Sequence, residues 1–259
     1  MRMSFEINPN LLNRTLPLPI NLNAVVDSSK SFELKKQDGT TTAGIIKGND
    51  FGLPHDLFVK RFNYRGFFDF LIHQFSNDRA KRLWERSLSL YKKNLPVPEP
   101  LSFIRSSFKK RNAFYLSRVV ENAESLWNIY KKGIFQENHA LLQLLARTIA
   151  EWHVKGAVHG DLKWPNILVQ KEHNGYAIFL IDLDQTRLYP GPSLKGISKD
   201  LKRFYRFGLE IGAEQWVESA FFPAYSACLP DEIKMGIDLA DIRRKAMQDW
   251  IKKGRKRLP

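Results

Sequence analysis

Cysteine is almost absent from this 259-residue sequence, in which Cys228 is the one copy. A single cysteine cannot form a disulfide within the chain, so a disulfide-rich secreted fold is excluded and a reducing compartment is expected. No uncharged apolar run reaches the roughly 18 residues that a membrane-spanning helix requires. The first residues also contain no apolar stretch of signal-peptide length. We therefore expect a cytoplasmic protein without a membrane span.

Acidic residues are scarce relative to basic ones. The 41 Lys and Arg against 27 Asp and Glu give a net charge of +14. This balance predicts an anionic partner, which can be nucleic acid, an acidic membrane surface or a phosphorylated ligand. Basic clusters lie at residues 79–82, 109–111, 131–132 and 252–257, and the last is a candidate peripheral membrane anchor. No nucleic-acid-binding motif is present, so a basic nucleic-acid-binding protein without catalysis is kept only as the alternative of a different class.

The hydrophobic pattern predicts an α+β chain of two lobes. Residues 31–120 alternate like antiparallel strands and include one helical stripe over 77–93. From 121 the period changes from two to 3.6, with one hairpin inside a mainly helical region that runs to 259. Residues 1–30 are interpreted as an irregular lead-in. We expect a small sheet-bearing N-lobe over 31–120 and a mainly helical C-lobe over 121–259.

The densest polar cluster is the segment 159–166, His-Gly-Asp-Leu-Lys-Trp-Pro-Asn, and Asp182 follows an apolar run sixteen residues later. Phosphoryl transfer from ATP needs a carboxylate for the attacking hydroxyl, oxygen ligands for Mg²⁺ and a cation on the nucleotide phosphates. Asp161 fits the base. Asn166 and Asp182 fit the ligands of Mg²⁺ or Mn²⁺. Lys60, on a predicted strand, fits the phosphate cation.

The order of these residues resembles the protein-kinase-like fold, because Asp161 and Asn166 have the spacing of its catalytic loop. Longer stretches look like the Kdo/WaaP family of lipopolysaccharide kinases, and the resemblance covers about residues 55–210. The stretches that carry it are residues 58–62, 79–100, 159–169, 180–187 and 199–204. The resemblance implies ATP-dependent phosphorylation of a sugar hydroxyl, on Kdo or heptose, in the inner core of lipopolysaccharide.

The same resemblance implies partners and further site residues. The acceptor would be a lipopolysaccharide core precursor or another anionic glycan, and the enzyme would be peripheral on the cytoplasmic face of the inner membrane. Lys163 would reach the γ-phosphate, and Asp200 would brace the catalytic loop. A kinase of another small molecule or of protein stays the alternative. The short stretch between Asp184 and Asp200 argues against a protein kinase, because it leaves little room for an activation segment.

Three positions depart from the kinase pattern. Gly160 replaces the arginine that commonly senses a phosphorylated activation loop, so that switch is not expected. Asp184 replaces the glycine of Asp-Phe-Gly and is either a further carboxylate of the site or a turn cap. The glutamate that pairs with the strand lysine precedes the helix tryptophan in the family, whereas here Glu85 follows Trp84. Glu85 is still the predicted partner of Lys60, with Asp78 as the alternative.

A phosphate-binding glycine loop of the G-x-G-x-x-G type is missing. The loop over the phosphates is therefore predicted at residues 37–41, with Gly39 and Thr40 as nucleotide-binding residues. A plain hairpin turn with no nucleotide role is the alternative interpretation.

Overall fold

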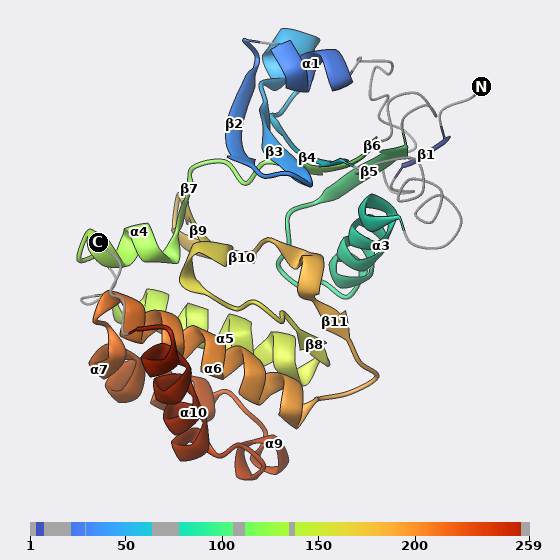
Figure 1. Cartoon of the computed structure of the whole chain (residues 1–259). Coiled ribbons are helices and arrows are strands. Elements are labelled where there is room, and N and C mark those ends of the chain that lie inside the picture. Colours follow the sequence, from blue (N-terminus) through green and yellow to red (C-terminus); the bar gives the residue numbers. More distant parts are fainter. Residues whose placement is uncertain are drawn as a thin grey trace. The chain divides into compact units, whose positions relative to one another are not determined.

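The computed structural model describes residues 4–7, 22–28, 30–63, 78–105, 112–134 and 138–254. It forms two compact units. Figure 1 shows their elements, coloured along the sequence. The first unit comprises residues 1–93 and 98–120, and the second comprises residues 94–97 and 121–259. In the part of the chain that is described, no helix has both the length and the apolar character needed to cross a bilayer.

The first unit contains a six-stranded antiparallel sheet in the order β1-β5-β6-β4-β3-β2. Its strands are β1 (Ser4–Ile7), β2 (Phe32–Gln37), β3 (Thr41–Ile46), β4 (Leu57–Asn63), β5 (Pro100–Arg105) and β6 (Asn112–Arg118). A short 3-10 helix, η2 (Gly48–Phe51), joins β3 to β4. The β-branched and aromatic residues of these strands favour a pleated, half-buried surface, which explains why they form the sheet. Ile46, Val59 and Phe114 are among the residues that form its core.

Helix α3 (Arg79–Lys92) packs on β5 and β6 within this unit. It begins after Asp78, whose carboxylate accepts hydrogen bonds from two backbone N–H groups of the first turn. Its apolar stripe faces the sheet, and the Trp84 ring lies 6.0 Å from the Phe103 ring. The helix predicted from the stripe over 77–93 is therefore present.

The interpretation of residues 1–30 as irregular is wrong where the structure describes them. Strand β1 pairs with β5 at one edge of the sheet, and helix α1 (Leu22–Ser28) buries Leu22 and Val25 in the core. Both elements are too short to form alone, so tertiary pairing and burial stabilise them and local sequence pattern does not reveal them. Residues 8–21 lie outside the described part.

The second unit is mainly helical, with two small sheets. The three-stranded sheet has the order β10-β9-β7, and the two-stranded sheet pairs β11 with β8. Its strands are β7 (Ala123–Ser125), β8 (Ala157–Val158), β9 (Ile167–Glu172), β10 (Gly175–Leu180) and β11 (Arg187–Leu188). Its helices are α4 (Leu126–Lys131), α5 (His139–Val154), η3 (Trp164–Asn166), η4 (Leu183–Gln185), α6 (Leu194–Ile211), α7 (Glu214–Trp216), the π-helical η5 (Val217–Phe221), α8 (Phe222–Ala227), α9 (Asp231–Met235) and α10 (Leu239–Lys252).

Aromatic side chains form the centre of this unit around Trp164, which is fully buried. Its ring lies 5.3 Å from Phe204 of α6, 5.1 Å from Tyr130 of α4 and 5.4 Å from Trp216 of α7. Helix α6 also packs along α10, as Figure 1 shows. Trp164 belongs to the polar segment 159–166, so that segment is attached directly to the hydrophobic core.

Candidate active site

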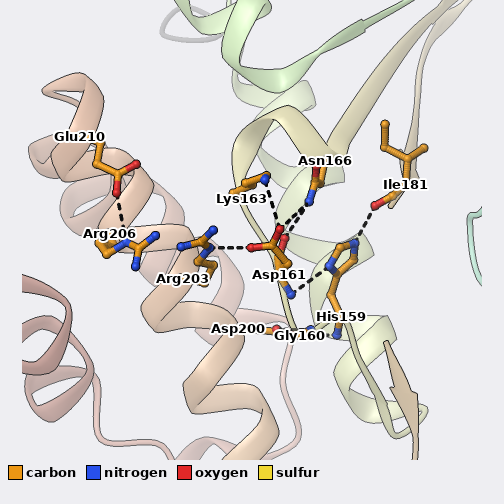
Figure 2. A network of polar contacts seen from close by, with 10 residues as sticks. All are labelled: His159, Gly160, Asp161, Lys163, Asn166, Ile181, Asp200, Arg203, Arg206 and Glu210. Carbon is orange, nitrogen blue, oxygen red and sulfur yellow. Dashed lines mark hydrogen bonds and ion pairs between the residues drawn. The ribbon is translucent and has the colours of Figure 1, made fainter. Parts of the chain in front are cut away.

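The candidate catalytic loop, residues 159–166, follows strand β8 and is held by one carboxylate on helix α6 (Figure 2). Asp200 is completely buried. Its two oxygens accept hydrogen bonds from the backbone N–H groups of His159, at 2.6 Å, and Gly160, at 2.7 Å. Such donors are required, because an unpaired charge in a protein interior is strongly destabilising. The prediction that Asp200 braces the loop is confirmed.

Gly160 adopts a backbone conformation that only glycine tolerates here. Its φ of +81° lies in the left-handed region, where a residue with a side chain is less stable by about 1–2 kcal/mol. A Cβ at this position would also lie 2.6 Å from the backbone oxygen of Gln185. The departure from the kinase arginine therefore has a local steric reason.

His159 links the loop to the segment that carries Asp182. Its Nε2 lies 2.9 Å from the carbonyl oxygen of Ile181. A carbonyl only accepts, so Nε2 carries the hydrogen, and Nδ1 accepts a hydrogen bond from the backbone N–H of Asp161 at 3.3 Å. Burial lowers the pKa of His159 from its ordinary value of 6.5, because burial disfavours the charged imidazolium. His159 is thus a neutral link in this network.

The carboxylate of Asp161 is surrounded by three donor groups. Its Oδ1 accepts a hydrogen bond from Arg203 Nε at 2.7 Å. Its Oδ2 lies 3.1 Å from Lys163 Nζ and 3.3 Å from Asn166 Nδ2. The side chain is only 14% exposed, so these donors fix its direction. The structure therefore brings together Asp161, Lys163 and Asn166, as the sequence predicted, and adds Arg203.

Asn166 and Asp182 are connected through one residue. The backbone N–H of Ile181 donates to the carbonyl oxygen of Asn166 at 2.9 Å, and Asp182 follows directly. Asp182 has φ +59° and ψ +56°, a left-handed conformation that aspartate tolerates better than most residues. This hydrogen bond brings the backbones of the two predicted metal ligands next to each other.

The orientation of the Asn166 amide fits a cation. Its Nδ2 donates to both the backbone oxygen and Oδ2 of Asp161, at 3.0 and 3.3 Å. Both partners only accept, so the amide cannot be turned around, and Oδ1 is directed away from Asp161. An amide oxygen together with the Asp182 carboxylate is the oxygen donor type that Mg²⁺ prefers. Among the described residues, no group of three or more His, Cys, Asp or Glu side chains could hold a metal ion.

Asp184 lies in η4, two residues after Asp182, and is half-buried. Both predicted roles, a further carboxylate of the site and a turn cap, stay predictions.

Lys60 lies on β4 of the first unit, opposite Ala43 of β3 and Tyr115 of β6. It is buried, and its Nζ is 5.8 Å from the centre of the Phe62 ring. A buried ammonium with an apolar stem is consistent with the predicted role, which stays a prediction.

Gly39 and Thr40 lie at the turn between β2 and β3. Asp38 organises this turn, because its Oδ1 accepts hydrogen bonds from the backbone N–H of Thr40 at 2.9 Å and of Thr41 at 2.8 Å. These bonds hold the pKa of Asp38 down at about 2. The N–H of Thr40 is therefore used inside the turn, which favours the plain hairpin interpretation.

The predicted pairing of Glu85 with Lys60 is wrong. Glu85 is half-exposed and forms its ion pair with Lys81, one turn earlier on α3, at 3.7 Å. The reason is helical geometry, since residues four apart on a helix are neighbours. Asp78 is instead a buried helix cap, and its Oδ2 also pairs with Arg105 at 2.8 Å.

Arg203 is the residue that sequence reasoning missed. Asp200 and Arg203 are three residues apart on α6, so they share one face of the helix. That spacing was a usable signal: once Asp200 is expected to hold the loop backbone, the next basic residue on the same face is expected near Asp161.

Comparison with known proteins identifies one family. Residues 35–225 match the profile described as the lipopolysaccharide kinase (Kdo/WaaP) family. Two curated relatives, both named 3-deoxy-D-manno-octulosonic acid kinase, come from Stenotrophomonas maltophilia strains R551-3 and K279a. The first is 29% identical over 145 residues, which is 54% of this chain and 55% of the relative. The second is 28% identical over 146 residues, 55% of each. This chain spans about half the length of the curated relatives that it matches.

A solved structure described as WaaP in complex with acyl carrier protein has the same fold. The TM-score is 0.61 at 17% sequence identity, and the match covers 96% of this chain and 99% of that one. The prediction of a protein-kinase-like α+β fold, with a small antiparallel sheet and a mainly helical part, is confirmed.

Proposed function

Because the chain belongs to the lipopolysaccharide kinase (Kdo/WaaP) family, we propose that it transfers the γ-phosphate of ATP to a hydroxyl of Kdo in the lipopolysaccharide inner core. The names of the two curated relatives favour Kdo over heptose as the acceptor. The observation that carries the proposal is the fixed carboxylate of Asp161, held by three donor groups on a loop that is itself bonded to Asp200.

The residues of the second unit have distinct proposed roles. Asp161 orients the acceptor hydroxyl and takes its proton as the oxygen attacks the γ-phosphorus and the bond to the bridging oxygen of ADP breaks. Lys163, already beside Asp161, neutralises charge on the transferred group. Asn166 Oδ1 and the Asp182 carboxylate hold Mg²⁺, which when bound neutralises charge on the nucleotide phosphates. Lys60 of the first unit contacts those phosphates.

The test is phosphate transfer from ATP to a Kdo-bearing lipopolysaccharide precursor, followed by mass spectrometry. We expect Asp161→Asn to lower kcat by about 10²–10⁴-fold, the usual contribution of a general base. Glu172→Gln is the matched control, because Glu172 is an exposed carboxylate at the β9–β10 turn. Wild-type activity should require Mg²⁺ or Mn²⁺. Normal turnover by Asp161→Asn, or full activity of the wild type in excess EDTA, contradicts these roles.

We also propose that the C-terminal end of α10 contacts an anionic membrane surface, where such a precursor resides. Met247 and Ile251 are exposed apolar residues one turn apart, and the exposed Lys252 and Lys253 follow them. This combination is typical of interfacial helices. The remaining basic tail, residues 255–259, lies outside the described part of the chain.

Sedimentation with vesicles that contain phosphatidylglycerol tests this contact. Each lysine near such a surface contributes about 1 kcal/mol, so the double variant Lys252→Glu, Lys253→Glu should bind at least about tenfold more weakly. Lys171→Glu, at an exposed lysine of β9, is the matched control. Equal binding by the double variant and the wild type would show that α10 is only a solvated helix.

A further inference from the structure

Helix α6 carries a row of basic side chains on one face. Lys195, Lys199, Arg203 and Arg206 follow one another at spacings of four, four and three, the periodicity of a single helix face. The first two are exposed, and Arg203 reaches the carboxylate of Asp161. Figure 2 shows Arg203 and Arg206 on neighbouring turns of α6 beside the loop. Arg206 pairs with Glu210 one turn later at 3.1 Å. Lys202 is not at a position of this row, and it pairs with Asp249 of α10 at 2.7 Å.

The contacts of Asp161 indicate where an acceptor hydroxyl can bind. Each carboxylate oxygen has two lone pairs. Among the described residues, Oδ2 faces Lys163 and Asn166, whereas Oδ1 faces Arg203 alone. The open acceptor position is therefore on Oδ1. A hydroxyl bound there lies next to the guanidinium group of Arg203.

That guanidinium is only partly used. Arg203 donates to Asp161 through Nε, and in the part of the chain that the structure describes its two terminal nitrogens donate no hydrogen bond. The side chain is 28% exposed, so these nitrogens are accessible. The parallel N–H groups of a guanidinium match the two oxygens of a carboxylate, which a lysine at the same position could not do.

We propose that Arg203 binds the carboxylate of the acidic sugar whose hydroxyl is phosphorylated, with Nε on Asp161 and the terminal nitrogens on the substrate. This inference rests on the proposed function and names the part of the acceptor that the site recognises. Arg203 would then select an acidic sugar over a neutral one. The exposed Lys199, one turn earlier, extends the positive surface toward other anionic groups of the acceptor.

The experiment compares three forms of one Kdo-terminated lipopolysaccharide precursor: the free acid, the carboxyl methyl ester and a form without its lipid phosphates. The wild type should prefer the acid to the ester by about 10- to 100-fold in kcat/KM, the contribution of a charge-assisted contact. Arg203→Gln should reduce that ratio to near one. Loss of the contact with Asp161 should lower kcat/KM for the acid and the ester alike. The ratio therefore reports recognition of the carboxylate and not the position of the base.

Two further variants complete the design. Arg203→Lys keeps the charge without the paired N–H groups, so its acid-to-ester ratio should lie between those of the wild type and Arg203→Gln. If Arg203→Gln does not fold, Arg203→Lys takes its place as the test. Lys202→Gln, at the neighbouring lysine that pairs with Asp249 of α10, should keep the wild-type ratio.

The outcomes separate the two proposals. A wild-type ratio that persists in both Arg203 variants overturns the inference and leaves the proposed function intact. The inference is also overturned if removing the lipid phosphates lowers kcat/KM while esterifying the carboxylate does not. If the wild type phosphorylates none of the three forms, the proposed function is wrong and the inference fails with it.

Discussion

Replacing Asp200 by asparagine is the sharpest test of how the catalytic loop is held. The substitution keeps the size of the side chain but removes its charge and converts one oxygen to an NH₂ group. In the wild type one oxygen accepts from His159 N–H and the other from Gly160 N–H. An amide has one acceptor oxygen, so one of these two buried N–H groups must lose its partner and face another donor.

The magnitude follows from these two bonds. A hydrogen bond to a charged group contributes about 1.5–3 kcal/mol, and a neutral one about 1 kcal/mol. Losing one charged bond and weakening the other therefore lowers the free energy of unfolding by about 3 kcal/mol. This is a large fraction of the roughly 5–15 kcal/mol that stabilises a typical domain. Because Asp161 follows Gly160 directly, a loop displaced by about 1 Å should also lower kcat by about 10²-fold.

Urea denaturation and steady-state kinetics measure the two effects. Asp249→Asn is the matched control, since Asp249 is a half-exposed carboxylate that pairs with Lys202, and such pairs contribute little to stability. If Asp200→Asn and Asp249→Asn unfold at the same urea concentration and turn over equally fast, Asp200 does not hold the loop.

Two further substitutions probe the same loop. Gly160→Ala should destabilise the protein by more than the roughly 1–2 kcal/mol that an alanine in the left-handed conformation costs, because its Cβ would also contact Gln185. Gly133→Ala is the control, since Gly133 has φ +73° with open space around it and should show the backbone effect alone. Equal losses of stability in urea denaturation would refute the contact with Gln185. The pKa of His159 is lowered by burial, so below pH 6.5 the unfolded chain binds more protons than the folded one. The free energy of unfolding should therefore decrease as the pH is lowered from 6.5 to the folded pKa, by at most about 1.4 kcal/mol per pH unit. His159→Gln should remove that contribution, and parallel pH profiles of the two proteins would show that His159 does not titrate with unfolding.

Residues that are close in the chain were predictable as a group. Asp161, Lys163 and Asn166 lie on one loop, and their side chains meet as their spacing suggested. Asp182 joins them through the backbone of Ile181, a contact between a loop and the end of a strand.

Contacts that depend on which face a helix presents were harder to predict. Glu85 is exposed on α3 and pairs with Lys81, although its place in the sequence suggested Lys60. Arg203 was missed for the opposite reason, because its role becomes visible only when α6 is oriented by Asp200. Strand β1 has no local signal, since an edge strand of four residues is stabilised by its neighbour β5.

The attachment of Trp164 has a consequence for how the protein opens. This indole is part of the catalytic loop and is also packed among Phe204, Tyr130 and Trp216. The loop cannot detach without exposing that aromatic group to water, so it belongs to the same cooperative folding unit as the core around it. The loop of the second unit thereby positions the Asp161 carboxylate through its own packing, so under the proposed function an acceptor would meet a preorganised base.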